Sequence, residues 1–145
     1  MAETLGSLCD KLTIVKLKQY HSEAKEKLDS LISQEIQLKE EIDQFILSAM
    51  QGIIPLEKLT FHSNKVYAMS DKDIERFKGT IGEVVSKLAE VNCELWHEQE
   101  KVYVFESVPA AQKNHVIKQL AKLNLERTSC IDEIDHVLFI SLKNR

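Results

Sequence analysis

Charged and polar side chains at seam positions of an otherwise apolar pattern are the residues that could do chemistry. Arg127 and Asn124 interrupt the last of three runs of apolar residues spaced three or four apart. Glu98 interrupts the middle run, and His21 interrupts the first. A buried guanidinium without a counter-charge is strongly unfavourable, so Arg127 requires a carboxylate partner. Glu98 is the nearest seam carboxylate on this pattern, and we expect it to be that partner.

The polar groups fall at similar heights along the three runs. If consecutive helices alternate in direction, a rise of about 1.5 Å per residue places them within about three turns of one another. Two interpretations stay open. The groups form a buried polar layer that fixes helix register, or they line a ligand pocket between helices. The candidate residues are Asp10, Lys11, Lys18, His21, Asn92, Trp96, Glu98, Asn124 and Arg127.

Metal chemistry is considered because two Glu-x-x-His patterns occur, Glu94/His97 and Glu133/His136. Helical di-iron proteins use this spacing, because residues i and i+3 project the same way. Here the two pairs differ in height by about 15–20 Å, so we interpret them as solvated helix faces. We expect no metal site and no cofactor, and no residue is assigned a catalytic role.

Few helix-breaking residues punctuate the chain. Gly52, Pro55 and Pro109 mark two breaks, and the segments between them have helical periodicity. The sequence therefore predicts an all-α fold, a long antiparallel three-helix bundle that forms one domain over residues 1–145. The expected helices cover residues 3–50, 71–107 and 110–142, and a short extra helix over 56–62, with Pro55 at its first position, is possible within the 51–70 connection.

The first predicted helix carries two apolar stripes. A coiled-coil-like seam runs through Ile14, Leu17 and His21, and a second stripe contains Leu5, Leu8, Leu12 and Val15. Two stripes require two neighbours, either within the chain or from a second subunit. This helix is also longer than the others, so we expect the connection or a second subunit to cover its end at residues 42–50. A homo-oligomer, most simply a dimer, or a protein partner is predicted.

Composition narrows the class of protein. The net charge of −4 argues against non-specific nucleic-acid binding, which depends on surplus Lys and Arg. No apolar run reaches the ~18 residues of a membrane span, and the first residues do not resemble a signal peptide. The three cysteines form no CxxC motif, and we interpret them as small buried residues. These features predict a soluble cytoplasmic protein with reduced thiols.

Three stretches of the chain together carry a resemblance: LCDKLTIVKLKQYH at 8–21, NCELWHEQE at 92–100 and LNLERTSCIDEID at 123–135. They resemble a bacterial family of small helical proteins of unknown function, whose pattern runs D-K-L-(S/T)-I…L-K-x-x-H, then N-x-x-L-W, then L-N-x-x-R. The resemblance implies an all-helical fold and a bacterial source. Members of the family tend to be encoded near surface-polysaccharide and glycosyltransferase genes, which implies a role in that setting.

Two functional hypotheses follow. The first is a non-catalytic interaction or assembly protein, which the resemblance links to surface-polysaccharide synthesis. The second is a small-molecule binding protein or enzyme that uses an inter-helix pocket around His21, Glu98, Asn124 and Arg127.

Overall fold

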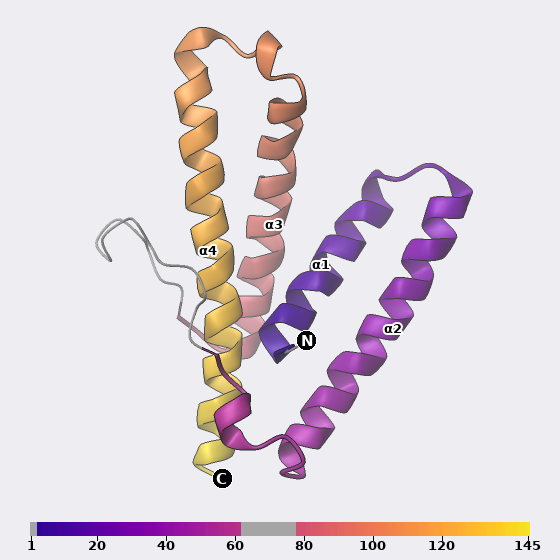
Figure 1. Cartoon of the computed structure of the whole chain (residues 1–145), viewed down its shortest axis with the longest axis vertical. Helices are drawn as coiled ribbons and strands as arrows, with labels where there is room; N and C mark the ends of the chain where they lie inside the picture. Colours follow the sequence, from indigo (N-terminus) through magenta and orange to yellow (C-terminus); the bar gives the residue numbers. More distant parts are fainter. Residues whose placement is uncertain (1–2, 62–77) are drawn as a thin grey trace.

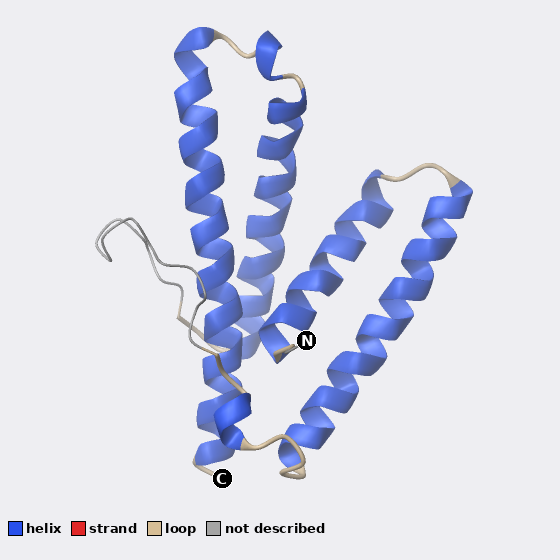
Figure 2. Cartoon of the chain, viewed as in Figure 1, coloured by secondary structure: helices blue, strands red, loops and turns tan. Residues whose placement is uncertain are grey.

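The structure is a computed structural model of the chain, and it describes residues 3–61 and 78–145. Within these ranges all regular structure is helical, and no strand forms (Figure 2). Two hairpins are present, rather than the expected three-helix bundle (Figure 1). The helices are α1 (Leu5–His21), α2 (Lys25–Met50), α3 (Ile81–Tyr103) and α4 (Ala110–Lys143), with 3₁₀ turns η1 (Leu56–Lys58) and η2 (Phe105–Ser107).

The single long helix predicted over residues 3–50 is wrong, because the chain turns back at residues 22–24. Ser22 has extended backbone angles and ends α1. The imidazole Nδ1 of His21 lies 2.9 Å from the carbonyl oxygen of Leu17, one turn earlier in the helix. Basic Lys18 and His21 lie in the last turn of α1, and acidic Glu26 lies in the first turn of α2. These charges complement the dipoles of both helix ends.

The return of the chain explains the two apolar stripes on its first segment. Leu8 and Val15 of α1 are buried against Leu31 and Leu38 of α2. The second neighbour that the stripes require is therefore α2 of the same chain. The opposite side of α1 packs on α3 and α4, so α1 lies between α2 and the α3–α4 hairpin (Figure 1).

At the start of α1, the backbone of Gly6 lies in close contact with the backbone of α4. A Cβ added to Gly6 would lie 2.3 Å from the carbonyl oxygen of Ile131, so only glycine fits there. The amide of Gly6 donates to Oδ1 of Asp135 at 2.7 Å. This carboxylate on α4 thus accepts one of the unpaired N–H groups at the start of α1, where a negative charge is favoured.

The helix of residues 71–107 begins later than predicted. Residues 78–80 are not helical, and α3 starts at Ile81, where the Thr80 hydroxyl oxygen accepts from the amide of Glu83. Ser70 and Asp71, either of which by residue type could cap the predicted helix at its start, lie outside the described residues. The predicted helix over 110–142 is confirmed to within one residue.

The first part of the connection folds back onto the bundle, as expected. Leu59 is fully buried in the same cluster as Ala49 and Ile134. The possible short helix over 56–62 is a single 3₁₀ turn over its first three residues, and Pro55 precedes it as the N-cap. The connection therefore covers the side of α2 that carries Ala49, whereas Leu47 and Met50 at the same end stay about half exposed.

The α3–α4 hairpin has its own apolar seam. On α3 it contains Val84, Leu88 and Val91, which are fully buried. On α4 Val116 is buried, whereas the next residue, Ile117, is 54% exposed. In the described part of the chain, no helix is long and apolar enough to cross a lipid bilayer.

Candidate functional site

Arg127 has a carboxylate partner, but the partner is Asp10. The guanidinium binds the Asp10 carboxylate in a bidentate manner, with Nε to Oδ1 at 2.8 Å and Nη2 to Oδ2 at 2.5 Å. The Asp10 side chain is 6% exposed and the Arg127 side chain 33%. The hydrogen bond to Asp10 raises the pKa of Arg127 above its ordinary value. The pair therefore joins α1 to α4 through two charge-assisted hydrogen bonds.

Asn92 brings α3 into the same layer. Its Nδ2 donates to Oδ1 of Asp10 at 2.9 Å and to the hydroxyl of Thr13 at 2.8 Å. The Thr13 hydroxyl in turn donates to the backbone carbonyl of Asp10 at 2.8 Å. Three helices thus meet at one hydrogen-bonded carboxylate. Such a satisfied network fixes the register of the helices, which supports the structural interpretation for Asp10, Asn92 and Arg127.

Glu98 is not part of this layer, which corrects the predicted Glu98–Arg127 pair. Its Oε1 accepts from Lys101 on the same helix at 2.9 Å. Its Oε2 is buried and has no hydrogen-bond partner within the described residues. Glu98 and Arg127 lie on α3 and α4, so the turn between α1 and α2 does not affect their relative heights, but it does change which residues of α1 lie beside Arg127. The turn at residues 22–24 reverses α2, and Asp10 was not included among the seam positions.

His21 forms a second centre, about 16 Å along α1 from Asp10 by the rise of an α-helix. Its ring stacks on the Trp96 indole, with centroids 4.6 Å apart and an interplanar angle of 19°. The Trp96 N–H donates to Oε1 of Glu100 at 2.9 Å. Since a carbonyl only accepts, the contact of His21 Nδ1 with the Leu17 carbonyl places the ring proton on Nδ1.

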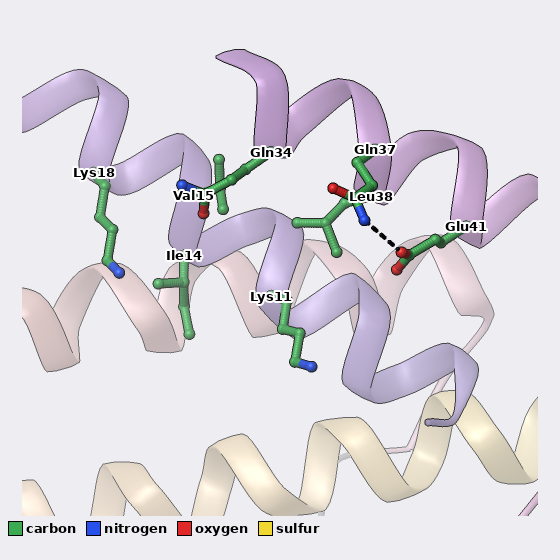
Figure 3. Close-up of a pocket in the computed structure, with 8 residues that line it drawn as sticks. All are labelled: Lys11, Ile14, Val15, Lys18, Gln34, Gln37, Leu38 and Glu41. Carbon is green, nitrogen blue, oxygen red and sulfur yellow. Dashed lines mark hydrogen bonds between the residues drawn. The ribbon is translucent and has the colours of Figure 1, made fainter. Parts of the chain in front are cut away.

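Lys11, Lys18 and Ile14 project from one side of α1 and line a hollow against α2 (Figure 3). This hollow has a volume of about 300 Å³, and Gln34, Gln37, Leu38 and Glu41 of α2 form its other wall. A second hollow of about 380 Å³ continues from Lys18 past His21 to Trp96 and Lys27. A third, of about 290 Å³, extends from Ile14 and Trp96 to Asn124 and Arg127.

These three hollows share lining residues, and we call them together the α1 groove. Lys18 and Gln34 line both the first and the second, Trp96 lines the second and the third, and Ile14 lines the first and the third. The groove thus follows the open side of α1, where the two hairpins diverge. Seven of the nine predicted site residues line it: Lys11, Lys18, His21, Asn92, Trp96, Asn124 and Arg127.

The lining of the α1 groove is basic in a chain of net charge −4. Lys11, Lys18, Lys27 and Arg127 line it, and Glu41 is the one carboxylate among its lining residues. Lys11 is paired with Glu3, and Arg127 with Asp10. Within residues 3–61 and 78–145, Lys18 and Lys27 have no ion-pair partner. Two ammonium groups are therefore free to meet an anion.

Several residues of these sites were not predicted. Neither Lys27 nor Thr13 lies at a seam position, so the apolar pattern does not indicate them. Lys27 lines the groove because the chain turns back at residues 22–24. Asp135 could have been found, since it neighbours the seam residue Ile134 and a buried carboxylate requires donors. Burial raises the pKa of Asp135 to about 6, and the hydrogen bond from Gly6 opposes this.

Cys9 and Cys130 are not activated nucleophiles. Burial raises the pKa of Cys9 to about 11, and burial likewise raises the pKa of Cys130 to about 11. A thiol with so high a pKa is almost wholly protonated near neutral pH, and the thiolate is the reactive form. All three cysteines are unpaired in the structure.

Comparison of the chain with protein-family models, with curated proteins and with solved structures gave no match.

Proposed function

We propose that this chain is a non-catalytic binding protein that holds an anionic, hydroxyl-rich small molecule of the phosphorylated-sugar class in the α1 groove. The observation that carries the proposal is the charge of the groove. In a protein of net charge −4, Lys18 and Lys27 line the groove with no ion-pair partner within the described residues. Lys11 and Arg127 also line it and are paired with Glu3 and Asp10. Such a separation of charge concentrates anions at one place on the surface.

The other lining residues define the rest of the ligand. Ser22, Ser30 and Gln34 lie beside Lys18 and Lys27 in the second hollow. Hydroxyl and amide side chains donate and accept, which suits the alternating groups of a sugar. Lysine ammonium groups suit a phosphate, which they meet as point charges. The volumes of the three hollows lie near the lower end of the range that is usual for small-molecule binding sites.

The side chains that line the groove support a binding function rather than a catalytic one. His21 is the imidazole that lines it, and its Nδ1 is held by the backbone carbonyl of Leu17 rather than by a carboxylate. The Asp10 carboxylate is occupied by Arg127 and Asn92. A base oriented by a second group and placed beside a nucleophile, as hydrolytic sites require, is not formed by these residues.

The motif resemblance extends the proposal to a biological setting. A cytoplasmic protein of a bacterium that makes surface polysaccharides would meet sugar phosphates and nucleotide sugars, which are ligands of the class that the groove favours. The reduced state of Cys9, Cys93 and Cys130 is compatible with the cytoplasm.

The test is calorimetric titration of the protein with UDP-glucose, glucose 1-phosphate and uncharged glucose. We expect the two phosphorylated probes to bind and glucose not to bind. Lys18→Ala and Lys27→Ala should each weaken binding about tenfold, the effect of losing one charge-assisted hydrogen bond. Lys122→Ala removes the same charge from α4 outside the groove, and it should leave the affinity unchanged.

Two results would overturn the proposal. One is that neither phosphorylated probe binds, and the other is that Lys18→Ala and Lys27→Ala behave like Lys122→Ala. Mass spectrometry of the recovered probe tests the non-catalytic part separately. A probe that is bound but chemically changed would show that the groove is an active site.

A further inference from the structure

A second apolar stripe on α2 faces away from the core. Ile32, Ile36, Leu47 and Met50 are each 47–52% exposed. At 100° per residue, these four side chains fall within about 60° of one another around the helix. The core-facing residues of α2, such as Leu31 and Leu38, lie on a different side. The stripe extends over about 27 Å of helix, with the pair Ile32 and Ile36 near one end and the pair Leu47 and Met50 near the other.

The stripe is symmetric in sequence about residue 41. Ile32 and Met50 lie nine residues on either side of this point, and Ile36 and Leu47 lie five and six residues away. Between them, Lys39 and Asp43 lie two residues before and two residues after it. When such a helix pairs with a copy of itself in the antiparallel direction, each position meets the position at the same distance on the other side.

We propose that two copies of this chain associate through α2, antiparallel, about a two-fold axis at the height of residue 41. In this register Ile32 meets Met50 of the second copy, and Ile36 lies one residue, about 1.5 Å, from the level of Leu47. Lys39 of each copy meets Asp43 of the other, so opposite charges lie at the same height in the middle of the contact. A surface that pairs with itself in this way is what an isologous dimer requires.

Complementary charge distinguishes a second copy from an unspecified apolar partner. Lys39 is 60% exposed and lies 3.0 Å from Glu35, and Asp43 is exposed. Neither side chain is held by the core, so both are free to reorient toward a partner helix. Glu40 lies at the rim of the stripe, where the two-fold axis brings it beside Glu40 of the second copy. This like-charge contact weakens the pair without preventing it.

The inference goes beyond the proposed ligand and does not depend on it. The α1 groove uses Gln34, Gln37 and Glu41 of α2, which lie on another side of that helix from the stripe. A dimer therefore leaves the groove open, and loss of the dimer leaves ligand binding intact.

Sedimentation velocity over a range of protein concentrations tests the association. Wild-type protein should form a dimer, and Leu47→Glu should weaken association by at least about tenfold. Glu40→Gln removes the rim repulsion and should strengthen association. Gln44→Glu is the matched control, because it adds the same charge as Leu47→Glu at an exposed position outside the stripe. Circular dichroism establishes that each variant is folded.

The register is tested by single cysteines. A mixture of Ile32→Cys and Met50→Cys proteins should form a mixed disulfide-linked pair under mild oxidation, above the background given by wild-type thiols. A wild-type protein that stays monomeric at every concentration would overturn the proposal. A dimer that Leu47→Glu leaves unchanged would overturn it too, as would Ile32→Cys pairing with itself, which indicates parallel helices.

Discussion

Replacement of Arg127 by alanine tests whether the Asp10 layer holds the hairpins together. The change removes both guanidinium hydrogen bonds from a carboxylate that is 6% exposed, and leaves Asn92 as its side-chain donor. Removing one partner of a buried ion pair destabilises a protein by 3–5 kcal/mol, and the one-third exposure of Arg127 places this pair at the low end, about 3 kcal/mol. For a chain of this length, that lowers Tm by about 10 °C.

The assay is urea denaturation at pH 7, followed by circular dichroism, on a double-mutant cycle. The cycle contains Arg127→Ala, Asp10→Asn and the double variant. Because the two side chains contact each other, the losses should not add, and the coupling free energy should be about 2 kcal/mol. Lys122→Ala on the same helix controls for the loss of a positive charge. A coupling below about 0.5 kcal/mol, the usual error of additivity, would refute the reasoning.

Three other changes probe the contacts of α1. Gly6→Ala places a methyl group 2.3 Å from the Ile131 carbonyl oxygen, so unfolding free energy should fall by about 2–3 kcal/mol, and unchanged urea stability would contradict the close approach. Asp135 has a folded pKa of about 6 against an ordinary 3.8, so the folded state binds the proton more tightly. The contribution of Asp135 to the free energy of unfolding is therefore largest below about pH 4 and is lost as pH rises through about 6, a change of about 3 kcal/mol. Asp135→Asn should remove this pH dependence in denaturation curves. A variant with the same pH dependence as wild type would exclude this role of Asp135. His21→Ala removes the ring stacked on the single tryptophan, so Trp96 emission should shift to longer wavelength, whereas the exposed His136→Ala should leave it unchanged; identical spectra would show that the stack is not formed in solution.

Periodicity was sufficient to predict that the fold is helical, since long runs at three- and four-residue spacing have few other solutions. It did not predict the turn at residues 22–24. The seam through Leu17, His21, Ala24 and Leu28 continues in phase across the turn, and no glycine or proline marks it. The signal present was electrostatic, because basic residues end α1 and Glu26 begins α2. The two stripes of α1 were read correctly as requiring two neighbours, and the second is α2.

The sequence predicted most of the residues of the site, but it did not predict which of them bind each other. Arg127 requires a carboxylate, as the sequence indicated, but a seam pattern cannot choose between Glu98 and Asp10. Asp10 lies beside the apolar stripe of α1, and only the crossing of α1 over α3 and α4 brings it to Arg127. The same crossing separates His21 from that layer. What was expected as one polar centre is therefore a closed network at Asp10 and an open groove at Lys18, His21 and Trp96.

Titration of Trp96 fluorescence with UDP-glucose tests most directly whether the α1 groove is a binding site. The protein has one tryptophan, and its side chain lines two of the three hollows, so a ligand there changes the emission without any label. We predict a saturable change in wild-type protein and in Lys122→Ala, with a midpoint that moves about tenfold higher in Lys18→Ala. Emission that stays constant up to millimolar UDP-glucose, or a midpoint that Lys18→Ala does not move, would contradict the account.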